Sequence, residues 1–357
     1  MNAPASLAEL ADAVHSMPRV LGVGAQTKPR LSAVDAPKLT TKRLSGIVEY
    51  DPGEFTFTAL AGTPVREIAA ALAERGQYLP FDPMLLDAGS TLGGAVAAGL
   101  SGPGRFRFGG LRDFILGVRF VDGAGRLLRM GGKVVKNAAG FDLPKFFVGS
   151  LGRFGVLGEI TFKVFPRSAS TLTLKLAAPS IEAAAKLLVE CANSRWEADA
   201  LDIPPGGADV VLRLAGPETA LKALAAEILA RFEGELLSES AADAVWNDLR
   251  EFRWAHTGGA LYKIALAPAA VVPLAAAVAE LAGARIHFSA GGNVAFVSRP
   301  DDSLGTALDE QLQRLGLRGI ALRGSVPLWT GRRSQPEIAT AVKRALDPEN
   351  RFPTLDD

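Results

Sequence analysis

The feature that most constrains the fold is a run of small residues from Thr91 to Gly102, followed by further glycines at positions 104, 109 and 110. Side chains this small let the backbone approach a flat ligand closely and leave its amides free to donate hydrogen bonds. The same run also suits a tightly packed small-residue helix followed by a flexible loop. The sequence therefore predicts either a ligand-binding backbone or a close-packed helix here, and both interpretations stay open.

A second glycine motif, Gly22-Val23-Gly24-Ala25-Gln26-Thr27-Lys28, follows a short apolar run that predicts a strand. Glycines allow backbone amides to approach a pyrophosphate closely, and successive N–H groups can form an anion-binding nest. Pro29 and the irregular stretch after it argue against a helix opening here, and so against the Rossmann arrangement. The motif predicts a pyrophosphate loop of another fold, with a plain turn as the alternative.

The third motif is the most specific and runs from Gly131 to Lys163, with the sequence GGKVVKNAAGFDLPKFFVGSLGRFGVLGEITFK. Asp142 before Leu143-Pro144 predicts the start of a short helix, and the glycines that follow it lead into a strand. Because a strand edge that carries glycines exposes its backbone, it can pair with the polar edge of a ligand. The third motif therefore suits a ligand held by main-chain groups.

The pattern up to Pro166 predicts strands, short helices and glycine turns, with a hairpin over residues 46–60 and a helix opened by Thr63 and Pro64. After residue 167 the chain changes to alanine-rich helices over 180–193, 217–233 and 268–282, with strand-like runs at 172–176, 210–214 and 261–266. We therefore expect an α+β protein with domains at 1–167 and 168–333, and a segment 334–357 that returns to the first domain.

The composition excludes several classes of function. Thirty-nine basic residues against 38 acidic ones leave a net charge of +1, so nothing indicates nucleic acid or an anionic membrane as a partner. A single cysteine, Cys191, cannot hold an iron–sulfur cluster, which needs about four thiolates. Residues 1–16 lack the basic and apolar regions of a secretory signal, and residues 268–286 are interrupted by Pro273 and Glu280, so we expect a cytoplasmic protein without a transmembrane segment.

In their order along the chain the three motifs resemble the FAD-binding domain of vanillyl-alcohol-oxidase, or PCMH-type, flavoproteins, and more closely that of the E subunits of bacterial glycolate oxidases. The resemblance rests on GIVEYDPGEFTFTALAGTPVREI, LPFDP, TLGGAVAAGLSGP and the stretch from Leu111 to Pro166, about the first half of the chain. It implies a PCMH-type two-part FAD-binding domain, an α+β cap domain, and a C-terminal tail that packs back on the FAD domain.

The same resemblance implies which residues bind FAD. The pyrophosphate would be held by Gly22, Gly24, Gln26, Thr27 and Lys28. The flavin and its ribityl chain would be lined by Thr91, Leu92, Gly93, Gly94, Gly99 and Gly102. Backbone contacts would come from Gly155, Val156 and Leu157. The second motif lacks the three adjacent glycines usual in the family.

Some members of the family attach the flavin covalently through histidine or cysteine. The chain has only His15, His256, His287 and Cys191, none of them in a segment that matches the attachment position, so we expect dissociable FAD. A metal site needs two or three imidazoles together, and we expect none. His15 is interpreted as a surface residue, the other two as core or rim histidines, and Cys191 as a small buried hydrophobe.

No catalytic base stands out in the sequence. The weak candidates for clamping a substrate carboxylate are Arg105, Arg107 and Arg112, which suit surface or phosphate-facing charges equally well.

The resemblance implies an FAD-dependent oxidoreductase acting on CH-OH groups, in a glycolate oxidase complex that oxidises glycolate to glyoxylate. Electrons would pass to an iron–sulfur subunit, beside a D-type FAD subunit that carries its own histidine-rich motif. Two alternatives stay open: a self-sufficient FAD oxidoreductase for another 2-hydroxy acid or alcohol, and a scaffold subunit with an FAD-type fold. The complex would lie in the cytoplasm, or at the inner membrane through its partners.

Overall fold

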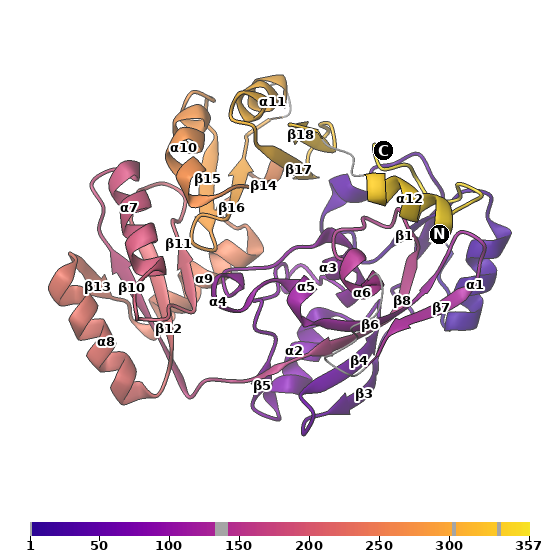
Figure 1. Ribbon diagram of the computed structural model, residues 1–357, viewed down its shortest axis with the longest axis horizontal. Coiled ribbons are helices and arrows are strands. Elements are labelled where there is room, and N and C mark those ends of the chain that lie inside the picture. Colours follow the sequence, from indigo (N-terminus) through magenta and orange to yellow (C-terminus); the bar gives the residue numbers. More distant parts are fainter. Residues whose placement is uncertain (1, 133–141, 302–304, 334–336) are drawn as a thin grey trace. The chain divides into compact units, whose positions relative to one another are not determined.

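The computed structural model describes residues 2–132, 142–301, 305–333 and 337–357. The chain divides into two compact units. Unit 1 comprises Met1–Ser101, Gly110–Arg167 and Ser334–Asp357, and unit 2 comprises Gly102–Gly109 and Ser168–Arg333. Both units mix helices with antiparallel sheets, which confirms the predicted α+β class (Figure 1).

Unit 1 is built on a five-stranded antiparallel sheet and a smaller parallel pair of strands. The five strands have the order β3-β4-β8-β6-β7, and the pair joins β1 to β2. The strand bounds are β1 Leu21–Val23, β2 Lys38–Thr40, β3 Ile47–Asp51, β4 Thr56–Leu60, β6 Ile115–Val121, β7 Leu127–Gly131 and β8 Val156–Lys163, with a further pair of β5 Gln77–Tyr78 and β9 Phe165–Pro166.

The helices of unit 1 are short. They are α1 Leu7–Ser16, α2 Val65–Ala73, α3 Leu92–Ala98, α5 Leu111–Phe114, α6 Leu143–Phe146 and α12 Glu337–Leu346, with a 3-10 turn η1 at Pro29–Ser32. α3 contains two glycines and ends at Gly99, whose φ of 58° lies in the left-handed region. The predicted small-residue helix therefore exists, and it packs on the sheet beside β4 and β8.

Unit 2 contains two antiparallel sheets. The first has the order β11-β12-β10-β13 and the second β15-β16-β14-β17-β18. Their bounds are β10 Ser170–Leu176, β11 Ala200–Asp202, β12 Val210–Gly216, β13 Gly234–Leu236, β14 Leu261–Ala265, β15 Arg285–Ser289, β16 Val294–Ser298, β17 Arg318–Arg323 and β18 Trp329–Gly331. The helices are α4 Arg105–Phe108, α7 Ile181–Ala192, α8 Glu218–Arg231, α9 Glu239–Glu251, α10 Val271–Ala279 and α11 Gly305–Arg314, with a 3-10 turn η2 at Pro268–Ala270.

Most sequence predictions of local structure are confirmed. The three alanine-rich helices, the hairpin of β3 and β4, and the short helix capped by the Asp142 side chain are all present. The predicted start of α2 was wrong: Pro64 is the N-cap residue and makes no side-chain cap. The Thr63 hydroxyl instead donates to the carbonyl of Leu60 at 2.7 Å and accepts from the amide of Gly46 at 2.9 Å, which stabilises the preceding turn.

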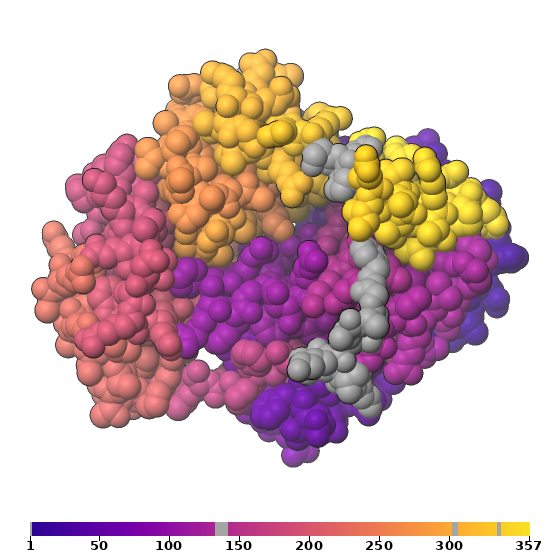
Figure 2. All heavy atoms as spheres, in the orientation of Figure 1, coloured from indigo at the N-terminus to yellow at the C-terminus, as the bar shows by residue number. Residues whose placement is uncertain are grey.

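The C-terminal segment packs on unit 1, as predicted for the tail. The amide of Gly123 donates to the Leu346 carbonyl, and Phe352, 2% exposed, joins a buried cluster that includes Val20 and Val156. In the space-filling view these yellow atoms lie against the indigo and magenta atoms of the same unit (Figure 2). Among the described residues, the helices are too short or too polar to cross a bilayer.

Candidate functional site

Two adjoining cavities in unit 1 are walled by three backbone segments: the loop after β1, the start of α3, and the turn that precedes β8. The empty space within them measures about 480 and 370 Å³, including part of the open solvent at their mouths. The walls common to both are Gly22, Val23, Gly24, Gly94 and Ala97. Three glycine-rich segments that are far apart in the sequence thus meet around one continuous region.

The structure brings most of the predicted FAD-binding residues together here. The larger cavity is lined by Gly22, Gly24, Gln26, Thr27, Lys28, Thr91 and Gly94. The smaller cavity adds Gly93, Gly155, Val156 and Leu157.

Three predicted residues lie away from both cavities. Leu92 is fully buried in the core, and Gly99 forms the left-handed end of α3. Gly102 belongs to the segment that joins unit 2. Part of the third motif, residues 133–141, lies outside the described residues.

The glycines of the walls are required by close packing. A Cβ atom at Gly22 would lie 2.8 Å from the Val156 side chain, and one at Gly93 would lie 2.8 Å from the Cβ of Ala61. A Cβ at Gly24 would collide with the hydroxyl of Thr91. Because that hydroxyl also accepts from the Gly94 amide at the start of α3, the loop and the helix hold each other in position.

The loop after β1 presents a run of unused donors. In the part of the chain that the structure describes, the backbone amides of residues 24–28 donate no hydrogen bond to a protein acceptor. Gln26 has a φ of 56°, the left-handed conformation that turns successive amides toward a common side. These five residues line the larger cavity. The loop therefore has the properties of an anion-binding nest.

Lys28 adds a buried positive charge to the same cavity. The residue is 7% exposed, and its Nζ donates to the Thr27 hydroxyl at 2.9 Å and the Ser90 hydroxyl at 3.3 Å. No carboxylate pairs with it among the described residues. Burial lowers the pKa of Lys28 to about 8. A buried ammonium without a counter-ion favours an anionic ligand.

The smaller cavity contains a hydroxyl group without a partner. Ser150 is 3% exposed, and its Oγ makes no hydrogen bond to any residue that the structure describes. Because buried polar groups are normally satisfied, this hydroxyl is suited to a polar group of a ligand. Gly152 and Gly155 lie in the same wall. The smaller cavity thus offers backbone and hydroxyl groups, whereas the larger one offers positive charge.

Several residues of these walls were not predicted from the sequence, among them Leu31, Ser90, Ser150 and Leu151. Ser90 directly precedes a predicted site residue, and Ser150 lies within the third motif, so proximity in sequence was the only available signal. Leu151 lies in the same motif, whereas Leu31 carries no such signal, because apolar residues in loops are common.

The arginine candidates do not converge on one site. Arg107 forms an ion pair with Glu197 at 2.6 Å inside unit 2, so its charge is already partnered. Arg105 lies on the same short helix α4, and Arg112 lies on α5 of unit 1; both are exposed. Their catalytic role stays a hypothesis.

The histidines and the cysteine have structural surroundings. His15 is exposed, and its ring approaches the Ala124 carbonyl at 3.4 Å. His287 is 1% exposed, with its Nε2 2.8 Å from Oδ2 of the buried Asp202. Cys191 is buried, and burial raises the pKa of its thiol to about 12. Within the described ranges, no group of three or more histidine, cysteine or acidic residues is placed to hold a metal ion.

Comparison with known proteins agrees with this geometry. Residues 2–131 match the family model described as FAD binding domain. The chain is 42% identical over 211 residues to glycolate oxidase subunit GlcE of Escherichia coli, covering 58% of this chain and 56% of that protein. It is 32% identical over 148 residues to glycolate oxidase subunit GlcD of Bacillus subtilis, covering 42% of this chain and 31% of that protein. The chain thus spans about half, or less, of the length of these curated relatives.

The fold also resembles a solved structure. The structure of alkyldihydroxyacetonephosphate synthase superposes with a TM-score of 0.69 and covers 98% of this chain and 75% of that one, at 14% identity. At this identity the likeness concerns the fold alone. Residues 2–131 are thus similar to an FAD-binding domain, and the fold is similar to that of this solved structure.

Proposed function

We propose that the chain is the FAD-binding subunit of a glycolate oxidase complex, takes part in the oxidation of glycolate to glyoxylate, and passes electrons to an iron–sulfur partner. The observation that carries the proposal is the 42% identity to the E. coli glycolate oxidase subunit, together with an anion-binding loop inside the matched FAD-binding domain. The similarity to a second glycolate oxidase subunit, from B. subtilis, supports a complex that also contains a D-type FAD subunit.

The residues of the two cavities fit FAD. The free amides of residues 24–28 and the Lys28 ammonium are suited to the pyrophosphate, which carries negative charge. The unpartnered hydroxyl of Ser150 and the backbone of residues 155–157 are suited to the polar ribityl chain or the ring edge. When bound, FAD supplies the two-electron chemistry that oxidation of a CH-OH group requires.

FAD would be dissociable. His15, His256, His287 and Cys191 do not line either cavity, so none is placed in these walls to bond the cofactor covalently. Within this proposal, residues 1–167 form the FAD-binding domain, 168–333 the cap, and 334–357 the returning segment, which the division into two compact units supports. The expected location is the cytoplasm, with attachment to the inner membrane only through the complex.

The iron–sulfur partner is inferred from chemistry. One cysteine in 357 residues cannot ligate a cluster, so onward electron transfer through iron and sulfur needs another polypeptide. No base can be assigned among the residues that line the cavities, because their titratable member is Lys28. Substrate oxidation therefore need not occur on this chain when it is isolated.

The test compares the isolated chain with the assembled complex. Glycolate is added without oxygen to each, and bleaching of the flavin is followed by absorbance. The proposal expects glycolate-dependent bleaching in the complex and co-purification of an iron–sulfur polypeptide with a tagged chain. Bleaching of the isolated chain by another hydroxy acid, with no co-purifying subunit, would replace the proposal with a self-sufficient oxidoreductase.

A further inference from the structure

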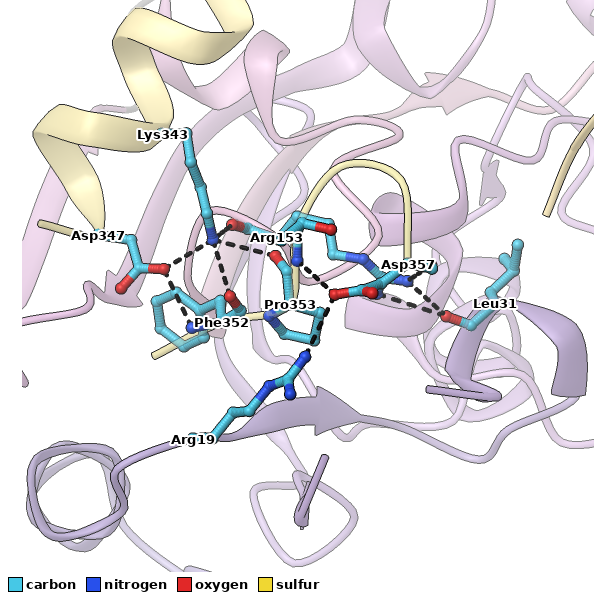
Figure 3. Close-up of polar contacts among 9 residues, drawn as sticks. Arg19, Leu31, Arg153, Lys343, Asp347, Phe352, Pro353 and Asp357 are labelled. Carbon is cyan, nitrogen blue, oxygen red and sulfur yellow. Dashed lines mark hydrogen bonds and ion pairs between the residues drawn. The ribbon is translucent and has the colours of Figure 1, made fainter. Parts of the chain in front are cut away.

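The C-terminal segment makes its polar contacts with the backbone that walls the two cavities. Figure 3 shows Lys343, Asp347 and Asp357 gathered around Arg153, which lies in the turn before β8. That turn contributes Ser150, Leu151, Gly152 and Gly155 to the cavity walls. The tail is therefore connected to the walls although it does not line either cavity.

Lys343 is the centre of these contacts. Its Nζ donates to the backbone carbonyl of Arg153 at 2.7 Å and to those of Phe352 and Pro353 at 3.1 Å each. It also forms an ion pair with Asp347 Oδ2 at 2.6 Å, and the Asp347 side chain is fully buried. One ammonium thus joins helix α12, the last residues of the chain and the turn of the cavity wall.

Arg153 extends the connection to a second wall. Its side chain is 1% exposed and donates to the carbonyl of Leu151 at 2.6 Å and that of Leu31 at 3.5 Å. It also donates to the backbone oxygen of Asp357 at 2.7 Å. Leu31 and Leu151 both line the larger cavity. The guanidinium therefore links two parts of that lining to the tail.

The tail also holds the strand that leads into the anion-binding loop. The amide of Val20, directly before β1, donates to the Arg351 carbonyl at 2.8 Å. Arg351 in turn donates to the carbonyls of His15 and Met17. Arg19 reaches Asp357 Oδ2 at 3.3 Å, as Figure 3 shows. Both ends of the cavity lining, β1 and the turn before β8, are thus tied to one segment.

Several residues of the walls have no side chain that could anchor them. Gly22, Gly24, Gly152 and Gly155 have no side chains to anchor them, and Leu151 adopts a φ of 55° that costs conformational energy for a non-glycine residue. Backbone without side-chain anchors gains order mainly from hydrogen bonds supplied by its surroundings. The tail supplies such bonds to both walls.

We propose that residues 343–357 act as a strap that fixes the two backbone walls of the FAD site and so sets the affinity for FAD, with Lys343 and Arg153 as positioning residues. The proposal rests on the FAD site described above and adds a part of the chain, distant in sequence, that does not line either cavity. A wall that is already in position loses less entropy when the ligand binds, so the affinity is higher.

The test uses Lys343→Met in the full chain, with Arg344→Met as the matched control. Arg344 lies next to Lys343 on α12, is exposed, and forms no hydrogen bond or ion pair with the cavity walls among the described residues. The dissociation constant for FAD is measured on the apo proteins by the change in flavin fluorescence. We expect it to rise about tenfold in Lys343→Met and to stay unchanged in Arg344→Met.

A second measurement distinguishes the proposed role of Lys343 in ordering the cavity walls from a role in stability alone. Hydrogen exchange of the apo proteins should be faster in Lys343→Met at residues 20–28 and 150–155, and unchanged at β10 and β12 of unit 2. Equal FAD affinity in both variants, or faster exchange limited to residues 337–357, would overturn the strap. If Lys343→Met does not fold, Lys343→Gln, which keeps one donor group, takes its place with the same two readouts.

Failure of the strap and failure of the FAD assignment give different results. A wild-type chain that does not bind FAD contradicts the site itself. A wild-type chain that binds FAD, together with Lys343→Met that binds it equally well, contradicts only the strap.

Discussion

The ammonium of Lys28 lies 3.3 Å from the hydroxyl of Ser90, in the lining of a cavity where its hydrogen-bond partners are neutral oxygens. The two residues come from the loop after β1 and from the segment just before α3. Because desolvation lowers the pKa of Lys28 to about 8, the apo protein holds this charge at a cost. An anionic cofactor would offset this free energy of desolvation. We therefore expect the pyrophosphate to bind next to Lys28 and Ser90.

Replacing Lys28 with Met should separate affinity from stability. Removing the ammonium should weaken FAD binding on the order of 100-fold, because a desolvated charge pair is lost. The same change should stabilise the apo protein by up to about 3 kcal/mol, the cost that corresponds to a pKa lowered from 10.5 to about 8. Titration with FAD and thermal unfolding of the apo protein check the two effects. A variant that loses stability and keeps its affinity would contradict this role.

FAD binding should depend on pH through the same group. Lys28 is charged in the apo protein below about pH 8 and loses its proton above it. Since the bound anion favours the charged form, the affinity should be constant below about pH 8 and fall by up to about tenfold per pH unit above it. Lys28→Met provides the control, because its affinity should lack this fall. Parallel pH profiles for the two proteins would exclude Lys28 as the titrating group.

The stability of the apo protein should show the opposite pH trend. The pKa of Lys28 is lowered in the folded state, so the unfolded state binds more protons between about pH 8 and about pH 10.5. The contribution of Lys28 to the free energy of unfolding therefore rises with pH across that window. Comparing denaturant midpoints of the wild type and Lys28→Met at several pH values isolates this contribution.

Replacing Gly24 with Ala should disrupt the site by packing alone. The added Cβ would collide with the Thr91 hydroxyl that caps α3, so the loop and the helix would have to separate. We expect a loss of about 1–3 kcal/mol in the free energy of unfolding, as for other overpacked positions, and weaker FAD binding. Gly53→Ala is the control, since its Cβ would meet nothing closer than 3.4 Å. Normal FAD affinity in Gly24→Ala would show that these walls do not form the site.

The buried pair of His287 and Asp202 in unit 2 should matter for stability. Asp202 Oδ2 lies 2.8 Å from His287 Nε2, and its Oδ1 accepts from the Ala290 amide at 2.9 Å. Asp202→Ala should cost about 2–4 kcal/mol, because it leaves buried donors without acceptors. Asp243→Ala, at an exposed position on α9, should change little. Denaturant unfolding of the two variants measures the difference.

The local structure of this chain follows largely from its residue patterns. Asp142 caps its helix as expected, and β3 and β4 pair around the predicted turn. The run from Thr91 shows why both of its interpretations could stay open: residues of α3 are packed in the core, while Thr91, Gly93 and Gly94 line the cavities. Helix α9 was not predicted from the sequence. Only Trp246 and Leu249 of its residues are buried, which leaves little apolar periodicity to recognise.

The contacts that hold the cavity walls in place could not be predicted from the sequence. Lys343 and Arg153 are 190 residues apart, and their contact depends on how the tail returns to unit 1. The sequence predicts that the tail returns but contains no pattern that identifies its partners. Ser150 is similarly hidden, since a serine next to a glycine is common in turns and only burial reveals its unpartnered hydroxyl.

The most direct test of the FAD assignment is the visible absorption spectrum of the purified chain, recorded before and after acid precipitation. We expect a yellow protein whose flavin is released into the supernatant, where it is identified as FAD. A colourless protein that takes up no added FAD, or a flavin that stays in the precipitate, would contradict the claim that this chain holds dissociable FAD in its two cavities.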